Sequence, residues 1–151
     1  MSASFESLTE AHAKKLLVGD CLSQLQQLPD DFVQTCVTSP PYWAQRDYLT
    51  RQWFDEDPAC SHTEREWAGD TAVCLQCRGW YGQLGLEPEP EEYVNHLVEI
   101  FREVRRVLRK DGTFFLNIGD TYASESGDGY KVKDLVGIPW MVAFALRKDG
   151  W

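Results

Sequence analysis

The sequence lacks any apolar run near the roughly 20 residues that cross a bilayer, so an integral membrane protein is not expected. Its first residues carry no basic stretch followed by an apolar one, and so give no sign of a secretory leader. Basic residues are scarce, because 15 Lys and Arg face 24 Asp and Glu, for a formal charge of −9. That balance argues against a protein that coats nucleic acid through bulk attraction to phosphate.

What the sequence does contain is enough apolar material, 43% of 151 residues, for one domain with a core. Strand-like and helix-like segments alternate along it. The strand candidates are residues 15–20, 32–38 and 113–120, and the helix candidates are residues 22–28, 90–109 and 139–148. This order predicts right-handed crossovers and a parallel sheet flanked by helices, which is an α/β fold.

All three strand candidates end in polar or special residues. Gly19–Asp20 ends the first, Ser39–Tyr42 follows the second, and Gly119–Asp120 ends the third. Ligands of parallel α/β sheets bind beyond the carboxyl ends of the strands. We therefore expect three functional edges on one side of one sheet.

The last helix candidate indicates that residues 1–151 are the front part of a longer protein. Its end, Ala145–Gly150, repeats the pattern of Val107–Gly112, after which a strand begins at once. Only Trp151 follows Gly150. Three strands alone would also leave a sheet edge exposed.

The segment Ser39-Pro40-Pro41-Tyr42-Trp43 has an unusual set of chemical groups for a strand end. The Ser39 hydroxyl can accept a hydrogen bond, and the Pro-Pro backbone holds carbonyl oxygens rigidly with no N–H to compete. Tyr42 and Trp43 offer flat faces for stacking. This combination suits an exocyclic amino group on a planar ring, such as a base swung out of its stack. The alternative is a proline-rich turn with incidental aromatic residues.

Several ordered segments resemble the amino-methyltransferases of DNA, in the circularly permuted beta class. They are Val18–Asp20, Leu28–Asp31, Val37–Trp43, Asn117–Tyr122 and Asp134–Trp140. The resemblance implies a partial Rossmann-like, S-adenosylmethionine-dependent methyltransferase fold, with residues 1–151 as the N-terminal part of the catalytic domain. It further implies a cytoplasmic protein, prokaryotic or phage-encoded.

The resemblance also implies roles for particular residues. The Ser39 side chain and the Pro40 carbonyl would accept hydrogen bonds from the target amino group, and Tyr42 would stack on the flipped base. Transfer would be direct, with no covalent enzyme intermediate and no catalytic cysteine. The candidate catalytic residues are thus Ser39, Pro40, Pro41 and Tyr42. The candidate cofactor contacts are Asp20, Ser39 and Pro40. A solvated strand end is the alternative for Asp20 and the favoured interpretation of Asp120.

Serine at the first motif position resembles the cytosine N4 enzymes more than the adenine N6 ones, and adenine N6 stays open. The implied partner is double-stranded DNA, with a cognate restriction endonuclease as a further one. The family's Phe-x-Gly-x-Gly cofactor loop has no counterpart here, since Gly79, Gly82 and Gly85 lie in no strand-to-helix context. We expect that loop beyond residue 151. The alternatives are a non-catalytic, zinc-containing fragment or partner, and methylation of RNA or of a protein amide.

Residues 54–86 contain two pairs of potential metal ligands. Cys60-Ser-His62 and Cys74-Leu-Gln-Cys77 together supply three thiolates and one imidazole, a tetrahedral zinc set with no open position. The spacing predicts a zinc-binding insertion with a structural ion, against the alternative of four unrelated residues. Cys21 and Cys36 are interpreted as structural, Cys36 as a buried small hydrophobe.

The remaining charged and titratable residues receive ordinary interpretations. His12 and His96 are expected to face solvent, and the carboxylates of Glu87–Glu92 to lie in a solvated loop and a helix N-terminus. Four arginines are candidates for phosphate contact, with ordinary surface charge as the alternative: Arg46, Arg51, Arg65 and Arg78.

Overall fold

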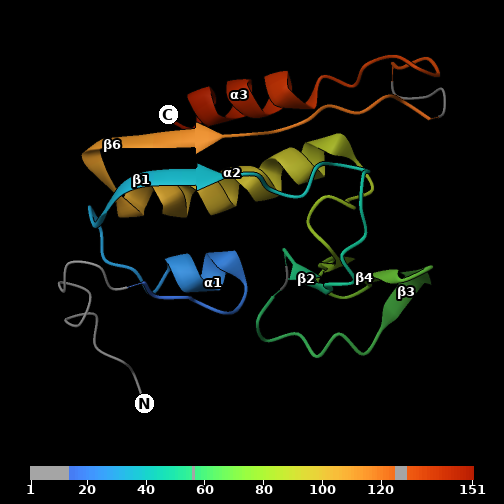
Figure 1. The fold of residues 1–151 in the computed structure, drawn as a ribbon. Coiled ribbons are helices and arrows are strands. Elements are labelled where there is room, and N and C mark those ends of the chain that lie inside the picture. Colours follow the sequence, from blue (N-terminus) through green and yellow to red (C-terminus); the bar gives the residue numbers. More distant parts are fainter. Residues whose placement is uncertain (1–13, 56, 125–128) are drawn as a thin grey trace.

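The computed structural model describes residues 14–55, 57–124 and 129–151. His12 lies outside them. The elements in chain order are α1 (Cys21–Leu25), β1 (Val33–Thr38), β2 (Gln52–Phe54), β3 (Arg65–Ala68), β4 (Thr71–Cys74), β5 (Trp80–Gly82), α2 (Pro90–Val107), β6 (Leu108–Leu116) and α3 (Ile138–Lys148). They form the mixed α/β arrangement with a parallel strand pair that the alternation predicts (Figure 1).

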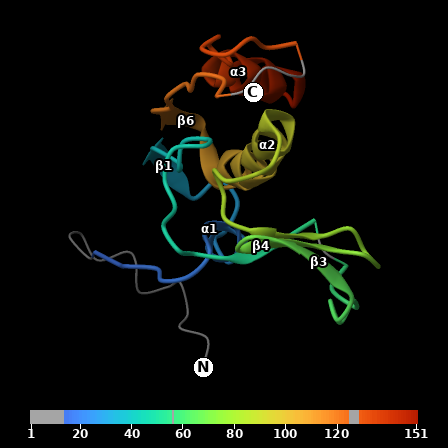
Figure 2. The same cartoon turned by 90° about the vertical axis from the view of Figure 1, so that its right-hand side faces the viewer.

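The strands belong to two separate sheets. β1 and β6 pair in parallel, and this pair carries the segment Ser39–Tyr42 at its carboxyl end. The second sheet is antiparallel, has the order β2-β5-β4-β3, and extends to one side of the helices (Figure 2). Residues 54–86 thus contain short strands that are not among the strand candidates of the sequence analysis.

Helix α2 covers one face of the β1–β6 pair and supplies most of the core. Pro90 lies in its first turn together with Glu91 and Glu92, where a missing N–H and negative charge are favourable. Its apolar residues at steps of three and four pack against α3 and β6. The cluster includes Tyr93, Leu97, Phe101 and Val104 from α2 and Ile138, Val142 and Leu146 from α3.

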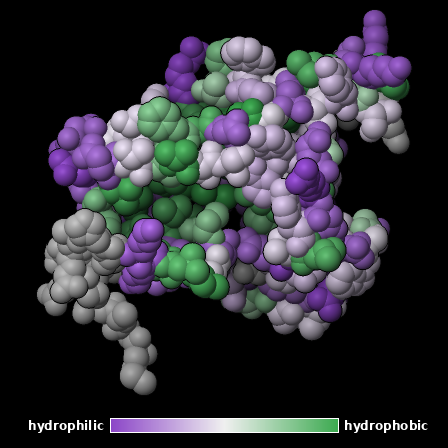
Figure 3. Space-filling model, viewed as in Figure 1, coloured by the Kyte–Doolittle hydropathy of each residue, from purple (hydrophilic) through white to green (hydrophobic). Residues whose placement is uncertain are grey.

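The opposite face of the β1–β6 pair is open. Val37 and Phe115 are partners in the register of this sheet and are 75% and 55% exposed. Figures 2 and 3 show that no helix of the described residues covers this side and that hydrophobic residues lie on it. No helix within the described parts of the chain is long and apolar enough to span a membrane.

The prediction of a strand at residues 15–20 is wrong. These residues take part in none of the described strand ladders, and Leu16 and Val18 are 87% and 81% exposed. An extended apolar run becomes a strand only where a neighbouring backbone satisfies its N–H and C=O groups. The expected functional edge at Gly19–Asp20 is therefore not a strand end.

The boundary between α2 and β6 also differs from the prediction. The helix ends at Val107, and β6 begins at Leu108 instead of Thr113. Val33 of β1 pairs with Leu108 of β6, but Thr35, two residues later, pairs with Thr113. Strand β6 therefore bulges across residues 109–112. This bulge absorbs the polar Arg-Lys-Asp-Gly segment, which looks like a helix terminus in the sequence.

Candidate functional site

The carboxyl ends of β1 and β6 lie together, as parallel pairing requires. The Asn117 N–H, just after β6, donates to the Thr38 carbonyl at 2.9 Å. The Ser39 hydroxyl donates to the Tyr42 hydroxyl at 3.3 Å, which leaves the serine oxygen free to accept. The Tyr42 ring lies against Gly119, where an added Cβ would be 2.7 Å from two ring carbons. Glycine therefore allows the ring to lie close to the end of β6.

Asp20 lies across a cavity from this motif and caps α1. Its Oδ1 accepts from the Ser23 N–H at 3.0 Å, and its Oδ2 accepts from the Gln52 side chain at 3.2 Å. A cap of this kind stabilises a helix by about 1 kcal/mol. Asp20 thus joins α1 to β2 through its two carboxylate oxygens.

Asp120, the polar residue beyond β6, has a structural role. Its Oδ1 accepts from the Thr121, Gly137 and Ile138 N–H groups at 2.9, 2.9 and 3.0 Å. Gly137 is the N-cap of α3 and Ile138 is its first residue, so the carboxylate fixes the start of that helix. Asp120 is therefore not the solvated strand end that the sequence analysis favoured.

Two adjoining cavities open beside the motif, where Figure 3 shows the surface hollowed between β1 and α1. One, of about 330 Å³, lies between Ser39–Pro41 and the apolar side chains of Leu97 and Phe101. The other, of about 350 Å³, lies between Asp20 and Pro41. Both contact Cys21 and Pro41. Clefts of this size and apolar character are typical of small-molecule sites.

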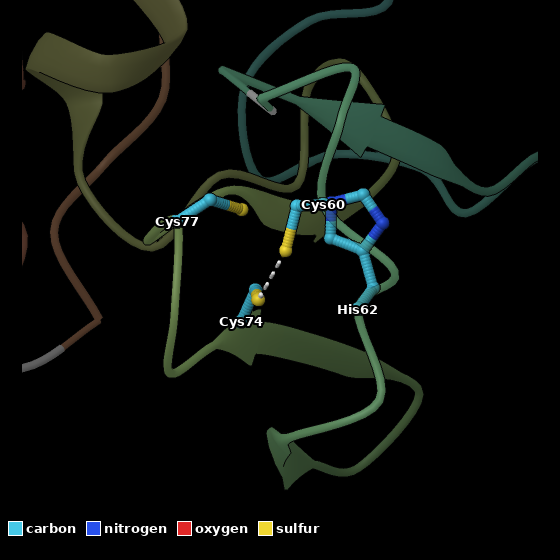
Figure 4. Close-up of side chains that lie close together, drawn as sticks. All are labelled: Cys60, His62, Cys74 and Cys77. Carbon is cyan, nitrogen blue, oxygen red and sulfur yellow. Dashed lines mark hydrogen bonds between the residues drawn. The ribbon is translucent and has the colours of Figure 1, made fainter.

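The four predicted metal ligands lie together beside the end of β4 (Figure 4). The ligand atoms of Cys60, His62, Cys74 and Cys77 all lie within 4.8 Å of one another. The Sγ atoms of Cys60 and Cys74 are 3.6 Å apart. Two sulfurs on one tetrahedral zinc ion are about 3.8 Å apart when each Zn–S bond is about 2.3 Å. The donor set and its spacing therefore fit zinc.

A tight turn after β4 brings Cys74 and Cys77 to the same point. Arg78 adopts a left-handed conformation with φ of 66°, and its N–H donates to the Cys74 carbonyl at 3.0 Å. The next N–H, of Gly79, donates to the Cys77 sulfur at 3.4 Å. Hydrogen bonds from the Asp57 and Gly79 backbone lower the pKa of Cys77, and one from the Cys77 backbone lowers that of Cys74. Both thiols thereby favour the thiolate that binds metal.

Two residues that the sequence analysis placed in solvent are buried beside the motif. His96 is 4% exposed and Glu87 is 3% exposed. Their side chains meet at 2.9 Å, and the second His96 nitrogen lies 3.0 Å from Asp55. Burial lowers the pKa of His96, but the hydrogen bonds to Glu87 and Asp55 outweigh it and raise that pKa overall. His96 lies three residues from Tyr93, on the apolar face of α2, and this spacing was the signal for its burial.

The four arginines differ in their surroundings. Arg51 donates to both carboxylate oxygens of Asp47 at 2.7 and 2.6 Å, and this pairing lowers the pKa of Asp47 to about 2. The Arg51 guanidinium is thus already paired with a carboxylate of the protein. Arg65 lies 5.1 Å above the Trp67 ring. Arg46 and Arg78 are exposed, and their contact with phosphate stays a prediction.

A parallel strand pair with helices on one face and Ser-Pro-Pro-Tyr at its carboxyl end is compatible with the methyltransferase family that the sequence resembles. Residues 33–151 match the family model described as DNA methylase, and the chain is a member of that family. It is 42% identical over 145 residues to the Type II methyltransferase M.SfiI of Streptomyces fimbriatus, covering 90% of this chain and 27% of the relative. No solved structure gives a significant match.

Two further relatives are matched over a larger share of their own length than M.SfiI is. The Type II methyltransferase M.Cfr9I of Citrobacter freundii is 37% identical, over 94% of this chain and 44% of its own length. The Type II methyltransferase M.SmaI of Serratia marcescens is 35% identical, over 91% of this chain and 44% of its own length. The chain therefore spans less than half the length of these relatives.

Proposed function

We propose that residues 1–151 form the N-terminal part of a permuted, Rossmann-like catalytic domain that methylates an exocyclic amino group of a base in DNA. The observation that carries this proposal is the position of Ser39–Tyr42 at the joined carboxyl ends of β1 and β6, beside an apolar cavity. The names of the relatives, which are Type II methyltransferases, support the same reaction.

The two cavities beside the motif would hold S-adenosylmethionine, with Asp20, Ser39 and Pro40 as its contacts. The apolar walls of the first cavity and the carboxylate at the second fit a ligand with both apolar and hydrogen-bonding parts. When bound, this cofactor supplies an electrophilic methyl group.

The residues of the motif act on the target base. Ser39 Oγ and the Pro40 carbonyl would accept the two N–H bonds of the amino group, which turns the nitrogen lone pair toward the cofactor side. Tyr42 would stack on the flipped ring. No side chain forms a bond to the base, so no cysteine is needed. Cytosine N4 is the proposed target because Ser39 leads the motif; adenine N6 is the alternative, and a cognate restriction endonuclease is a proposed partner.

We further propose that residues 54–86 form a zinc-binding insertion with a structural ion. The supporting observation is the cluster of Cys60, His62, Cys74 and Cys77, whose ligand atoms lie within 4.8 Å of one another. Four protein ligands fill a tetrahedral site, so the ion would stabilise the fold and not take part in the chemistry. A non-catalytic role for the whole chain is the second candidate, and this cluster would serve it equally well.

Methyl transfer to DNA by the full-length product of the reading frame tests the proposal. With labelled S-adenosylmethionine, we expect label in double-stranded DNA, and a fall of at least about a hundredfold in Ser39→Ala because a transition-state hydrogen bond is lost. Ser61→Ala is the matched control, since Ser61 bonds only Thr63 on the surface among the described contacts. Unlabelled DNA with the wild-type protein would refute the enzyme and favour the non-catalytic role.

A further inference from the structure

Helix α2 contacts the Ser39–Tyr42 motif through the buried hydroxyl of Tyr93. Tyr93 is fully buried, and its hydroxyl donates to the Pro41 carbonyl at 2.8 Å. Burial, together with the Glu87 carboxylate, raises the pKa of Tyr93, so the phenol stays protonated and keeps donating. The hydrogen bond holds the Pro41 carbonyl toward α2. Ser39 Oγ and the Pro40 carbonyl remain to meet an amino group.

The segment Gly82–Glu87 packs directly behind the same motif. A Cβ at Gly85 would lie 3.0 Å from Pro41 Cβ and 3.2 Å from the carbonyl oxygens of Pro41 and Tyr42. Gly85 has φ of 94°, which also favours glycine. Its carbonyl accepts from the Ala44 N–H at 2.8 Å. The backbone at Gly85 therefore determines how far Pro41 and Tyr42 can move away from the cavity.

Gly85 is itself held by a buried charged pair. Its N–H donates to Glu87 Oε2 at 2.8 Å, and the other oxygen of Glu87 lies 2.9 Å from His96 Nδ1. A protonated His96 donates to Glu87 and to Asp55, which follows β2. Phe54 stacks on the imidazole with ring centroids 4.6 Å apart. A carboxylate this deeply buried is stable only with such partners, so the group is rigid.

We infer that Tyr93 and the Glu87–His96 pair are positioning residues of the Ser39–Tyr42 motif. They fix the Pro41 carbonyl and the Gly85 backbone behind it, and they link the motif to the cysteine-rich insertion through Asp55. The inference rests on the proposed function, because a misplaced motif matters only where Ser39 and Pro40 must meet an amino group. A displacement of about 1 Å at a reacting centre can cost on the order of a hundredfold in rate.

Steady-state DNA methylation by the full-length product tests this inference. Tyr93→Phe removes only the hydroxyl, and we expect kcat to fall about tenfold while KM for S-adenosylmethionine and DNA stays within about twofold. Tyr130→Phe is the matched control, because that hydroxyl bonds another backbone carbonyl, of Val136, at 3.5 Å. We expect Tyr130→Phe to keep the wild-type kcat.

A second pair of variants tests the charged group. Glu87→Gln should lower kcat in the same way, whereas Glu89→Gln should not, since Glu89 is exposed and makes no capping bond to α2. If Tyr93→Phe does not fold, Glu87→Gln alone tests the inference, and a lower kcat with unchanged KM is again the expected result. An active wild type with unchanged kcat in Tyr93→Phe and Glu87→Gln would overturn this inference alone. An inactive wild type would overturn the proposed function and the inference with it.

Discussion

The hydroxyls of Ser39 and Tyr42 are 3.3 Å apart, while the Pro41 carbonyl is bound by Tyr93. The motif could be predicted from its residue types, because serine, two prolines and an aromatic residue leave few chemical interpretations. Its supports could not. Glu87 lies in an acidic segment that looks solvated, and only its contacts with Gly85 and His96 show why it is buried.

His96 provides a test at the level of one side chain. The pKa of its imidazole is raised above 6.5 in the folded state, so its pairing with Glu87 and Asp55 stabilises the protein fully below about pH 6.5. This contribution is lost as the pH rises through the folded pKa. We expect the free energy of unfolding to fall more steeply in the wild type than in Asp55→Asn as the pH rises above about 6.5.

Urea unfolding below and above about pH 6.5 measures this difference, and an NMR titration of the His96 ring gives its pKa directly. The variant is a fair control because Asp55 has a positive φ of 52°, a conformation that asparagine adopts readily. A titration midpoint for His96 below that of a free histidine would contradict the account of the buried pair.

Helices α2 and α3 could be predicted because their apolar residues recur at steps of three and four over several turns. The strands were harder. The run at residues 15–20 is apolar but has no neighbouring strand among the described residues, whereas β2 to β5 have only three or four residues each and show no clear alternation. Their stability comes from pairing with one another and from buried residues such as Cys74 and Trp80, which the sequence does not reveal.

The antiparallel sheet should depend on the metal, and the helical core should not. We expect the wild-type chain to bind near one equivalent of zinc, and Cys74→Ser to lose it, because three ligands with a serine hydroxyl hold zinc weakly. Amide protection in β2 to β5 should then fall at least about tenfold, while α2, α3 and β6 keep theirs. Their buried cluster contains no residue of 54–86 except a peripheral contact from Leu84.

Cys36→Ser is the matched control for this element, since Cys36 lies in β1 and far from the cluster along the chain. Zinc content by mass spectrometry and hydrogen exchange are the two measurements. Metal-free wild-type protein, or equal zinc in Cys74→Ser, would show that the four side chains do not form a metal site.

In the part of the chain that the structure describes, the β1–β6 pair has an open apolar face, and the whole sequence carries a net charge of −9. Val37 and Phe115 expose side chains over the β1–β6 pair, and apolar patches of this kind promote association. We expect the 151-residue chain to form concentration-dependent oligomers, and Phe115→Lys to shift it toward monomer by severalfold. Tyr48→Lys, at an exposed position in the loop after the motif, is the control. Sedimentation that shows a monomer throughout would contradict this expectation.

The negative charge is compatible with the proposed reaction at the level of the whole chain. The negative charge opposes non-specific attraction to the phosphate backbone. An enzyme that binds one flipped base, however, depends on stacking and hydrogen bonds in a single pocket. The chain spans less than half the length of its relatives M.Cfr9I and M.SmaI. Its net charge of −9 therefore belongs to these 151 residues alone.

The identity of the methylated nucleoside tests the central claim most directly. DNA treated with the full-length product and S-adenosylmethionine is digested to nucleosides and analysed by mass spectrometry. Our account predicts N4-methylcytosine, with N6-methyladenine as the alternative that keeps the same Ser39–Tyr42 chemistry. Methylation at a ring carbon, as in 5-methylcytosine, needs a covalent bond from the enzyme to the base and would contradict it, as would DNA without any added methyl group.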